Sequence, residues 1–144
     1  MSAETVQLIA RLPSPAEYNR LRRAVGWRLY DEEAIARCLP RSLYCLCAVQ
    51  DGEVIGMARL VGDGELVCYV QDVCVLPEYQ GQGLGQRLME AIMAYLRAHA
   101  APNTIVALMS SPGKEPFYER YGFLRRPNDR QGCGMQLPYD KGKP

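Results

Sequence analysis

Three glycines stand at alternate positions in this sequence, Gly81, Gly83 and Gly85, between an apolar run and a segment with helical periodicity. A glycine-rich turn at the start of a helix lets backbone N–H groups close on phosphate oxygens, and the positive end of the helix dipole favours the anion. A tight turn alone would not require glycine at three alternate positions. The spacing therefore predicts a phosphate-binding loop.

Two familiar phosphate-binding loops do not fit this segment. A Walker A loop ends in Gly-Lys followed by Ser or Thr, whereas Gln86 and Arg87 follow Gly85 here. A dinucleotide-binding loop has the spacing G-x-G-x-x-G near the start of a β-α-β unit, whereas this loop follows three predicted strands. The spacing excludes both kinds of loop.

Asp72 is the one charged residue in the apolar run Leu66–Leu76. On strand alternation it shares a face with Val70 and Cys74. Burying a carboxylate costs free energy unless the group is paired or has a function. Asp72 is therefore a candidate for chemistry, and the alternative is a structural acceptor for neighbouring loop amides.

Strand patterns predict an antiparallel meander ahead of the glycine loop. Apolar or alternating runs predict strands over Thr5–Arg11, Leu43–Val49, Val54–Val61 and Leu66–Leu76. Asp51-Gly52 predicts a tight hairpin turn, because this pair tolerates positive φ angles. Later runs predict a short strand over Ile105–Met109 and a final strand over Gly132–Leu137.

Helix signals complete the expected order of elements. Ser14-Pro15-Ala16-Glu17 contains an N-cap, a proline at the first helical position and a capping box, so a helix should run to about Val25. Asp31 can cap a second helix that runs through Leu39. Further helices are predicted from the glycine loop to His99 and over Lys114–Tyr121, the last ended by Gly122.

The order β-α-α-β-β-β-α-β-α-β predicts the α/β fold class. We expect a central mixed sheet, with an antiparallel meander followed by a β-α-β parallel pair and helices on both faces. The chain has 144 residues, of which 48% are hydrophobic and 23% charged, so we expect residues 1–144 to form a single domain.

Charge and hydropathy exclude several partners. The 17 Lys and Arg against 16 Asp and Glu give a net charge of +1, which argues against nucleic acid and anionic membranes as partners. No apolar run approaches the roughly 18 residues of a membrane span. Met1–Arg11 lacks the basic start and apolar stretch of a signal peptide, so the predicted location is cytoplasmic.

The six cysteines are predicted to be structural, and no metal site is predicted. Cys45, Cys47, Cys68 and Cys74 lie inside apolar runs, where free cysteine is commonly buried. The single histidine, His99, has no nearby cysteine or acidic cluster that could complete a zinc site.

Two motifs together resemble the GNAT superfamily of N-acetyltransferases. The stretch Asp72–Gly85, with V-x-P-E-Y followed by Gln-x-x-Gly-x-Gly, is similar to that family's acetyl-CoA-binding motif. The stretch Pro116–Phe123 is similar to its late F-Y-x-x-x-G-F signature. The separation of the two motifs and the β/α order over the whole chain also agree with the family.

The resemblance implies acetyl-CoA as the cosubstrate and a primary amine as the acceptor, acetylated by direct attack in a ternary complex. It implies that pantetheine pairs with the strand alongside Val73, Cys74 and Val75. It also implies that backbone amides bind the pyrophosphate over Gln80, Gly81, Gln82, Gly83, Leu84 and Gly85.

Two residues become candidates for proton transfer through this resemblance. Tyr118 fills the position of the family's general acid, which protonates the departing thiolate, and its alternative is a packing role beside Phe117 and Phe123. Tyr121, one helical turn on, is the competing donor. Family members often carry a base or amine ligand on the strand that contains Asp72, so Asp72 is predicted to deprotonate or orient the amine.

The acceptor side is less defined by the sequence. Trp27 and Tyr30, between the first two helices, predict an aromatic surface for an aromatic or cationic amine, unless Trp27 only packs the helix junction. Arg59, Arg125 and Arg126 either bind an acidic substrate group or the 3′-phosphate of CoA, or are solvated.

Near-neutral charge favours a small-molecule acceptor over a basic peptide, which would need an acidic groove. A covalent route through Cys74 is disfavoured, because no activating histidine is nearby. The alternative function is a non-catalytic acyl-CoA-binding regulatory module. A homodimer is common in the family, although no residue here indicates one.

Overall fold

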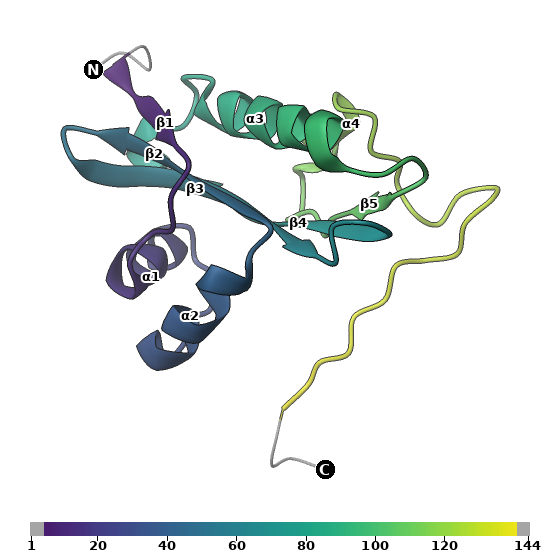
Figure 1. The fold of residues 1–144 in the computed structure, drawn as a ribbon, viewed down its shortest axis with the longest axis horizontal. Helices are drawn as coiled ribbons and strands as arrows, with labels where there is room; N and C mark the ends of the chain where they lie inside the picture. The colour runs from purple at the N-terminus through teal and green to yellow at the C-terminus, as the bar shows by residue number, and fades with distance from the viewer. Residues whose placement is uncertain (1–4, 141–144) are drawn as a thin grey trace. The chain divides into compact units, whose positions relative to one another are not determined.

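A computed structural model describes residues 5–140, which form two compact units that divide between Met109 and Ser110 (Figure 1). The first unit contains a five-stranded sheet in the order β1-β2-β3-β4-β5. The strands are Gln7–Ile9 (β1), Tyr44–Gln50 (β2), Glu53–Gly62 (β3), Val67–Val75 (β4) and Ile105–Ala107 (β5). Strands β1 to β4 are antiparallel and β5 runs parallel to β4, which confirms the predicted mixed sheet.

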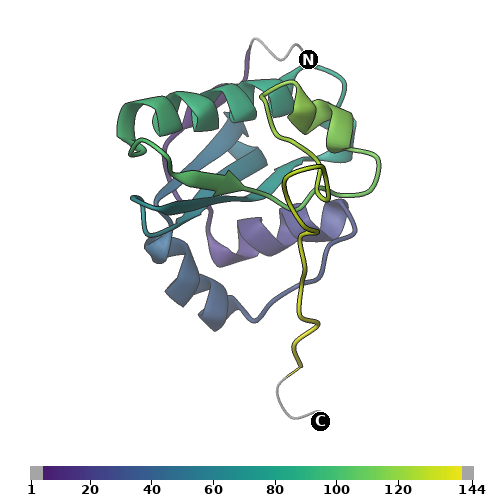
Figure 2. The same cartoon turned by 90° about the vertical axis from the view of Figure 1, so that its right-hand side faces the viewer.

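Helices cover both faces of this sheet, as predicted (Figures 1 and 2). Helices α1 (Pro15–Ala24) and α2 (Glu32–Cys38) lie on one face, and α3 (Leu84–His99) lies on the other. Helix α1 contacts β3 and β4, while α3 contacts β2, β3 and β4. Four buried residues of α3 recur at every fourth position, Leu84, Leu88, Ile92 and Leu96, and Met89 adds a fifth next to Leu88.

Local sequence signals set the ends of α1. The Ser14 Oγ accepts a hydrogen bond from the Glu17 N–H at 3.1 Å, and a Glu17 carboxylate oxygen accepts one from the Ser14 N–H at 2.8 Å. This reciprocal pair is the predicted capping box. After the last turn, Gly26 has a φ of +80°, which ends the helix where the sequence predicts.

The turn between β2 and β3 also follows its sequence signal. Asp51 and Gly52 have φ angles of +51° and +77°, the paired positive values of a type I′ hairpin turn. This hairpin joins β2 to β3, the longest strand of the sheet. By contrast, β1 and β5 are three residues each, shorter than the predicted Thr5–Arg11 and Ile105–Met109.

Strand β4 contains one extra residue opposite β3. Met57 pairs with Cys74 and Arg59 pairs with Gln71, so two steps along β3 match three along β4. Asp72 lies in this bulge with a φ of +58°, a conformation that residues other than glycine rarely adopt. The bulge locally changes the register of β4 around Asp72 and places the carboxylate among buried residues.

The second unit contains α4 (Glu115–Glu119) and a long segment without regular structure. Helix α4 is shorter than the predicted Lys114–Tyr121, and Gly122 follows it with a φ of +93°. The predicted strand over Gly132–Leu137 is wrong, because these residues form no strand and Met135 and Leu137 are 88% and 78% exposed. Two glycines in this run weaken its strand preference, and apolar alternation alone supplies no pairing partner.

Candidate active site

The glycine-rich segment connects the end of β4 to the first turn of α3. After Val75 the chain makes a short 3₁₀ helix, η3 (Pro77–Tyr79), and then reaches Gln80. The Gln80 side-chain amide donates a hydrogen bond to the Val75 carbonyl at 2.9 Å, which fixes the start of the loop against the strand. Gly81 and Gly83 both have a φ of +81°, and Gly83 is the N-cap of α3.

The loop backbone faces open space at both of these glycines. A Cβ atom added to Gly81 or Gly83 would meet no atom within 4 Å. Gln82 is exposed between them, whereas Leu84 is buried beneath the loop and Gly85 lies in the first helical turn. Open backbone at the N-terminus of a 16-residue helix fits the approach of phosphate oxygens.

Strand β4 extends well beyond its pairing with β5. The parallel pairs run only from Val67 to Tyr69 on β4, whereas the strand continues to Val75. Cys74 and Val75 pair with β3 on one side and with no β5 residue on the other. A strand with one such edge can pair with an extended ligand through its backbone, and Val73, Cys74 and Val75 lie in this part of β4.

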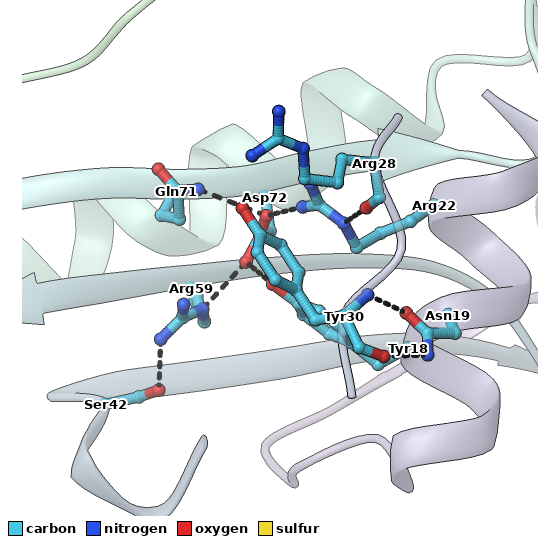
Figure 3. Close-up of polar contacts among 9 residues, drawn as sticks. All are labelled: Tyr18, Asn19, Arg22, Arg28, Tyr30, Ser42, Arg59, Gln71 and Asp72. Carbon is cyan, nitrogen blue, oxygen red and sulfur yellow. Dashed lines mark hydrogen bonds and ion pairs between the residues drawn. The ribbon is translucent and has the colours of Figure 1, made fainter. Parts of the chain in front are cut away.

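Asp72 accepts hydrogen bonds from four side chains (Figure 3). Its Oδ2 accepts from the Tyr18 hydroxyl at 2.5 Å and from Arg59 Nε at 2.8 Å. Its Oδ1 accepts from Arg22 Nη1 at 2.7 Å and from the Gln71 amide at 3.3 Å. The side chain is 1% exposed, so burial and these donors together hold a carboxylate in place.

Arg22 is enclosed by aromatic rings as well as by Asp72. Its guanidinium carbon lies 5.5 Å from the ring centroid of Tyr18, 5.3 Å from that of Trp27 and 4.9 Å from that of Tyr30. Its Nε donates to the Arg28 carbonyl at 2.6 Å. The cation that lies against Trp27 and Tyr30 in this structure is therefore the protein's own arginine.

Burial and charge shift the titration of groups around Asp72. Burial raises the pKa of Tyr18 well above its ordinary value, and the Asp72 charge and hydrogen bond raise it further. Burial opposes the charged form of Arg59, but the hydrogen bond and charge of Asp72 outweigh it and raise the Arg59 pKa. Burial raises the pKa of the Cys74 thiol to about 12, which leaves it protonated and a poor nucleophile near neutral pH.

Tyr118 lies on α4 in the second unit, within an aromatic cluster. Its ring centroid is 5.1 Å from that of Phe117 and 6.3 Å from that of Phe123, both in edge-to-face arrangements. Tyr121 packs against Phe117 at 5.7 Å. The two candidate donors therefore share one small cluster, and substitution of either by phenylalanine would keep its ring.

Sequence reasoning missed Tyr18 and Arg22, which lie one helical turn apart on α1. The available signal was that a buried Asp72 needs cationic or hydroxyl partners, and the spacing of these two residues puts both on one helix face. Of the three arginines singled out, Arg59 joins this cluster. Arg125 instead pairs with Glu119 at 2.7 Å, and Arg126 donates to the Gly132 carbonyl.

Two negative findings concern the part of the chain that the structure describes. No helix there is both long and apolar enough to cross a bilayer. Nor do three or more His, Cys, Asp or Glu side chains gather in a way that could hold a metal ion within residues 5–140.

Several curated proteins similar to this chain are named N-acetyltransferases. Serotonin N-acetyltransferase 2, chloroplastic, of Oryza sativa subsp. japonica is 34% identical over 115 residues, covering 77% of this chain and 56% of that protein. An uncharacterized N-acetyltransferase, ycf52-like, of Prochlorococcus marinus is 30% identical over 115 residues, covering 77% of this chain and 63% of the relative. The chain thus spans less than two thirds of the length of both relatives.

Solved structures show the same fold. A Staphylococcus aureus protein of unknown function, described as a "probable acetyltransferase", superposes with a TM-score of 0.85 at 30% identity, over 93% of this chain and 99% of that one. A GNAT family acetyltransferase from Elizabethkingia anophelis with acetyl-CoA bound superposes with a TM-score of 0.62 at 19% identity, over 85% of this chain and 78% of that one. At that lower identity the likeness concerns the fold alone.

The family model described as "Acetyltransferase (GNAT) family" matches residues 6–123, which include the glycine loop, the free edge of β4 and the segment of Tyr118. The chain belongs to the GNAT family of acetyltransferases, enzymes that use acetyl-CoA as the acetyl donor.

Proposed function

We propose that this protein transfers the acetyl group of acetyl-CoA to the primary amine of a small molecule, by direct attack in a ternary complex. The observation that carries the proposal is the open glycine loop at the N-terminus of α3, placed directly after a strand with an unpaired edge. One ligand with a phosphate end and an extended arm would occupy both features. The near-neutral charge of the chain supports a small acceptor over a basic peptide.

The cosubstrate would be held chiefly by backbone groups. We assign the pyrophosphate to the loop Gln80–Gly85, whose open glycines support close approach of an anion. We assign the pantetheine arm to the edge of β4 at Val73–Val75. The Gln80 hydrogen bond to Val75 ties these two parts of the site together.

The transfer itself needs an uncharged amine and a proton for the departing sulfur. The amine nitrogen forms a bond to the thioester carbonyl carbon and gives up one proton to a base or to solvent, the carbon–sulfur bond breaks, and the thiolate takes a proton. We assign that proton to the Tyr118 hydroxyl, with Tyr121 as the competing donor. Bound acetyl-CoA supplies the activated acyl group, and the protein supplies position and proton transfer.

Asp72 has two possible roles in this scheme. As a base or amine ligand, it would have to exchange one of its four donors for the substrate amine. As a positioning residue, it would hold Arg22 and Arg59 in place. Four donors already occupy the acceptor positions of a carboxylate, which supports the second role.

The test of the proposed function is thiol release from acetyl-CoA across a panel of small primary amines, with calorimetry of acetyl-CoA binding beside it. Binding together with turnover of at least one amine is expected. Binding without turnover of any amine would favour the alternative, a non-catalytic acyl-CoA-binding regulatory module.

Some features of the whole protein belong to this proposal as well. We expect both units to work as one domain over residues 1–144, because the family match crosses their division. We expect no nucleic-acid or membrane partner, and a homodimer stays a prediction. A cytoplasmic location also stays a prediction, since the rice relative is named chloroplastic.

A further inference from the structure

The buried cluster around Asp72 contains more positive than negative charge. Two guanidinium groups, Arg22 and Arg59, share the single carboxylate of Asp72, at 2.7 Å and 2.8 Å. Their side chains are 8% and 13% exposed, and neither forms a second ion pair within the described residues. The cluster therefore has a formal charge of +1 in a largely buried environment, which is unfavourable unless an anion compensates it.

Arg22 and Arg59 differ in how their excess charge is accommodated. The Arg22 guanidinium lies against three aromatic rings and donates to the Arg28 carbonyl, so much of its charge is satisfied inside the protein. Among residues 5–140, Arg59 hydrogen-bonds only to Ser42, through Nη1 at 3.2 Å, in addition to Asp72.

One nitrogen of Arg59 remains available to a ligand. Its Nη2 makes no hydrogen bond among the described residues. This atom is not fully buried, so it reaches solvent. Among the residues drawn in Figure 3, Arg59 is joined to Asp72 and Ser42. The exposed Arg28 lies in the same view, and no contact is drawn to its guanidinium. An anion could therefore approach Arg59 from solvent.

The cluster lies next to the place assigned to the reacting acetyl group, and this step rests on the proposed function. If the pyrophosphate binds after β4 and pantetheine runs back along Val75 to Val73, the acetyl end lies towards Asp72, the preceding residue. A protonated amine would be repelled by a net positive cluster there, whereas an amine that carries an anionic group would be attracted.

We propose that the acceptor amine carries a carboxylate and that Arg59 binds this carboxylate as the specificity-determining residue, with Arg22 beside it. The substrate class is then small amino acids, in which one end is acetylated and the other is recognised. Arginine suits this role because its guanidinium stays charged and forms strong, charge-assisted hydrogen bonds with carboxylates, here through Nη2.

The test compares matched acceptors under saturating acetyl-CoA. 4-Aminobutanoate, 4-aminobutanamide and butylamine share a primary amine on a four-carbon chain, and shorter and longer sets repeat the comparison. For the chain length with the highest turnover, the kcat/KM of the amino acid is expected to be about 10-fold to 100-fold above the kcat/KM of its amide. This is the range of a charge-assisted hydrogen bond. Butanoate should inhibit competitively against the acceptor, and butanamide should not.

Substitutions assign the preference to Arg59. Arg59→Gln is expected to bring the ratio of kcat/KM for the amino acid to that for its amide close to one, and Arg59→Lys should keep part of this ratio. Acetyl-CoA binding should be unchanged in both. Arg20→Gln, which removes an α1 arginine paired at the surface with Glu53, is the control and should keep the preference.

The possible results separate the carboxylate preference, the acetyltransferase activity and the role of Arg59. Turnover of amides and alkylamines as efficient as that of amino acids, without inhibition by butanoate, overturns the inference and leaves the proposed function intact. No turnover of any amine overturns both. A preference that survives Arg59→Gln overturns the assignment to Arg59, and the butanoate arm on the unsubstituted protein remains decisive if that variant does not fold.

Discussion

Asp72 is a buried carboxylate whose surroundings come from three different elements. Tyr18 and Arg22 belong to α1, Arg59 to β3, and Gln71 to β4 itself. The carboxylate therefore links the first helix to the centre of the sheet. Removing one partner of a buried charge pair leaves the other without compensation, which usually costs more free energy than the pair contributed.

Asp72→Asn is expected to lower the free energy of unfolding by about 3 to 5 kcal/mol, because it leaves Arg22 and Arg59 without their counter-charge. Urea denaturation followed by circular dichroism measures this change. A loss below about 1 kcal/mol would mean that the four hydrogen bonds contribute little to the fold.

The same variant separates the two roles of Asp72 in catalysis. If Asp72 is a base, acetylation should slow most below the pH optimum, where most of the amine is protonated. If it positions the arginines, the activity per folded molecule should fall by a similar factor at every pH. Rates normalised to the folded fraction across the pH range distinguish the two.

Tyr118→Phe should lower kcat by about 100-fold to 10,000-fold, the usual contribution of a general acid, while KM for acetyl-CoA changes little. Phenylalanine keeps the ring that packs on Phe117 and Phe123. Since a thiol has a pKa of roughly 8.5, the thiolate leaves more easily without a proton at high pH, and the deficit should shrink there.

Tyr121→Phe is the matched control in the same aromatic cluster and should be comparatively mild. Steady-state rates of both variants from neutral to alkaline pH provide the measurement. A larger loss for Tyr121→Phe would assign the acid to that residue. Equal activity of both variants and the unsubstituted protein would mean that the proton comes from water.

At the scale of elements, the glycine loop depends on backbone conformation and open space. Gly83 has a φ of +81° and open space beside its Cα. Gly83→Asp would put a side chain and a negative charge in that space, where phosphate has to approach. Acetyl-CoA affinity is expected to fall by at least about 2 kcal/mol, or about 30-fold, measured by calorimetry.

Gly52→Asp controls for the cost of the backbone conformation in this experiment. Gly52 has a similar φ of +77° and equally open surroundings, but it lies in the β2–β3 hairpin. Its substitution should leave acetyl-CoA binding unchanged. Unchanged binding in a folded Gly83→Asp variant would contradict the assignment of the loop.

Elements whose ends carry local signals could be predicted from the sequence. The capping box at Ser14, the Asp51-Gly52 turn and the glycine before α3 each specify a backbone conformation through a few neighbouring residues. Elements that depend on partners distant in the sequence could not be predicted in this way. The strand predicted over Gly132–Leu137 has alternating apolar residues but no ladder, and Arg22 resembles any surface arginine until Asp72 is placed against it.

At the scale of the whole molecule, free cysteines are distributed through the sheet. Burial raises the pKa of Cys45 to about 12, that of Cys47 to about 11 and that of Cys74 to about 12. In the unfolded chain these thiols titrate near 9, so above that pH the unfolded state binds fewer protons than the folded state. The free energy of unfolding should therefore fall as pH rises from about 9 towards 11.

Each buried thiol contributes up to about 1.4 kcal/mol per pH unit to that slope. Cys47→Ala is expected to flatten the dependence by about that amount, whatever its effect on stability at pH 7. Urea unfolding at pH 7.5 and pH 10 measures the slope. Cys38→Ala, at an exposed cysteine, is the control and should leave it unchanged. An identical slope in Cys47→Ala would show that this thiol ionises in the folded protein.

The tryptophan beside Arg22 also gives the molecule an internal fluorescent probe. Trp27 is the single tryptophan of the chain, so all indole fluorescence originates beside the Arg22 guanidinium. That guanidinium is bonded to the carboxylate that Arg59 shares. Any acceptor that shifts this charge cluster would change the surroundings of one known fluorophore, and its arrival could be followed by emission without a label or a coupled reaction.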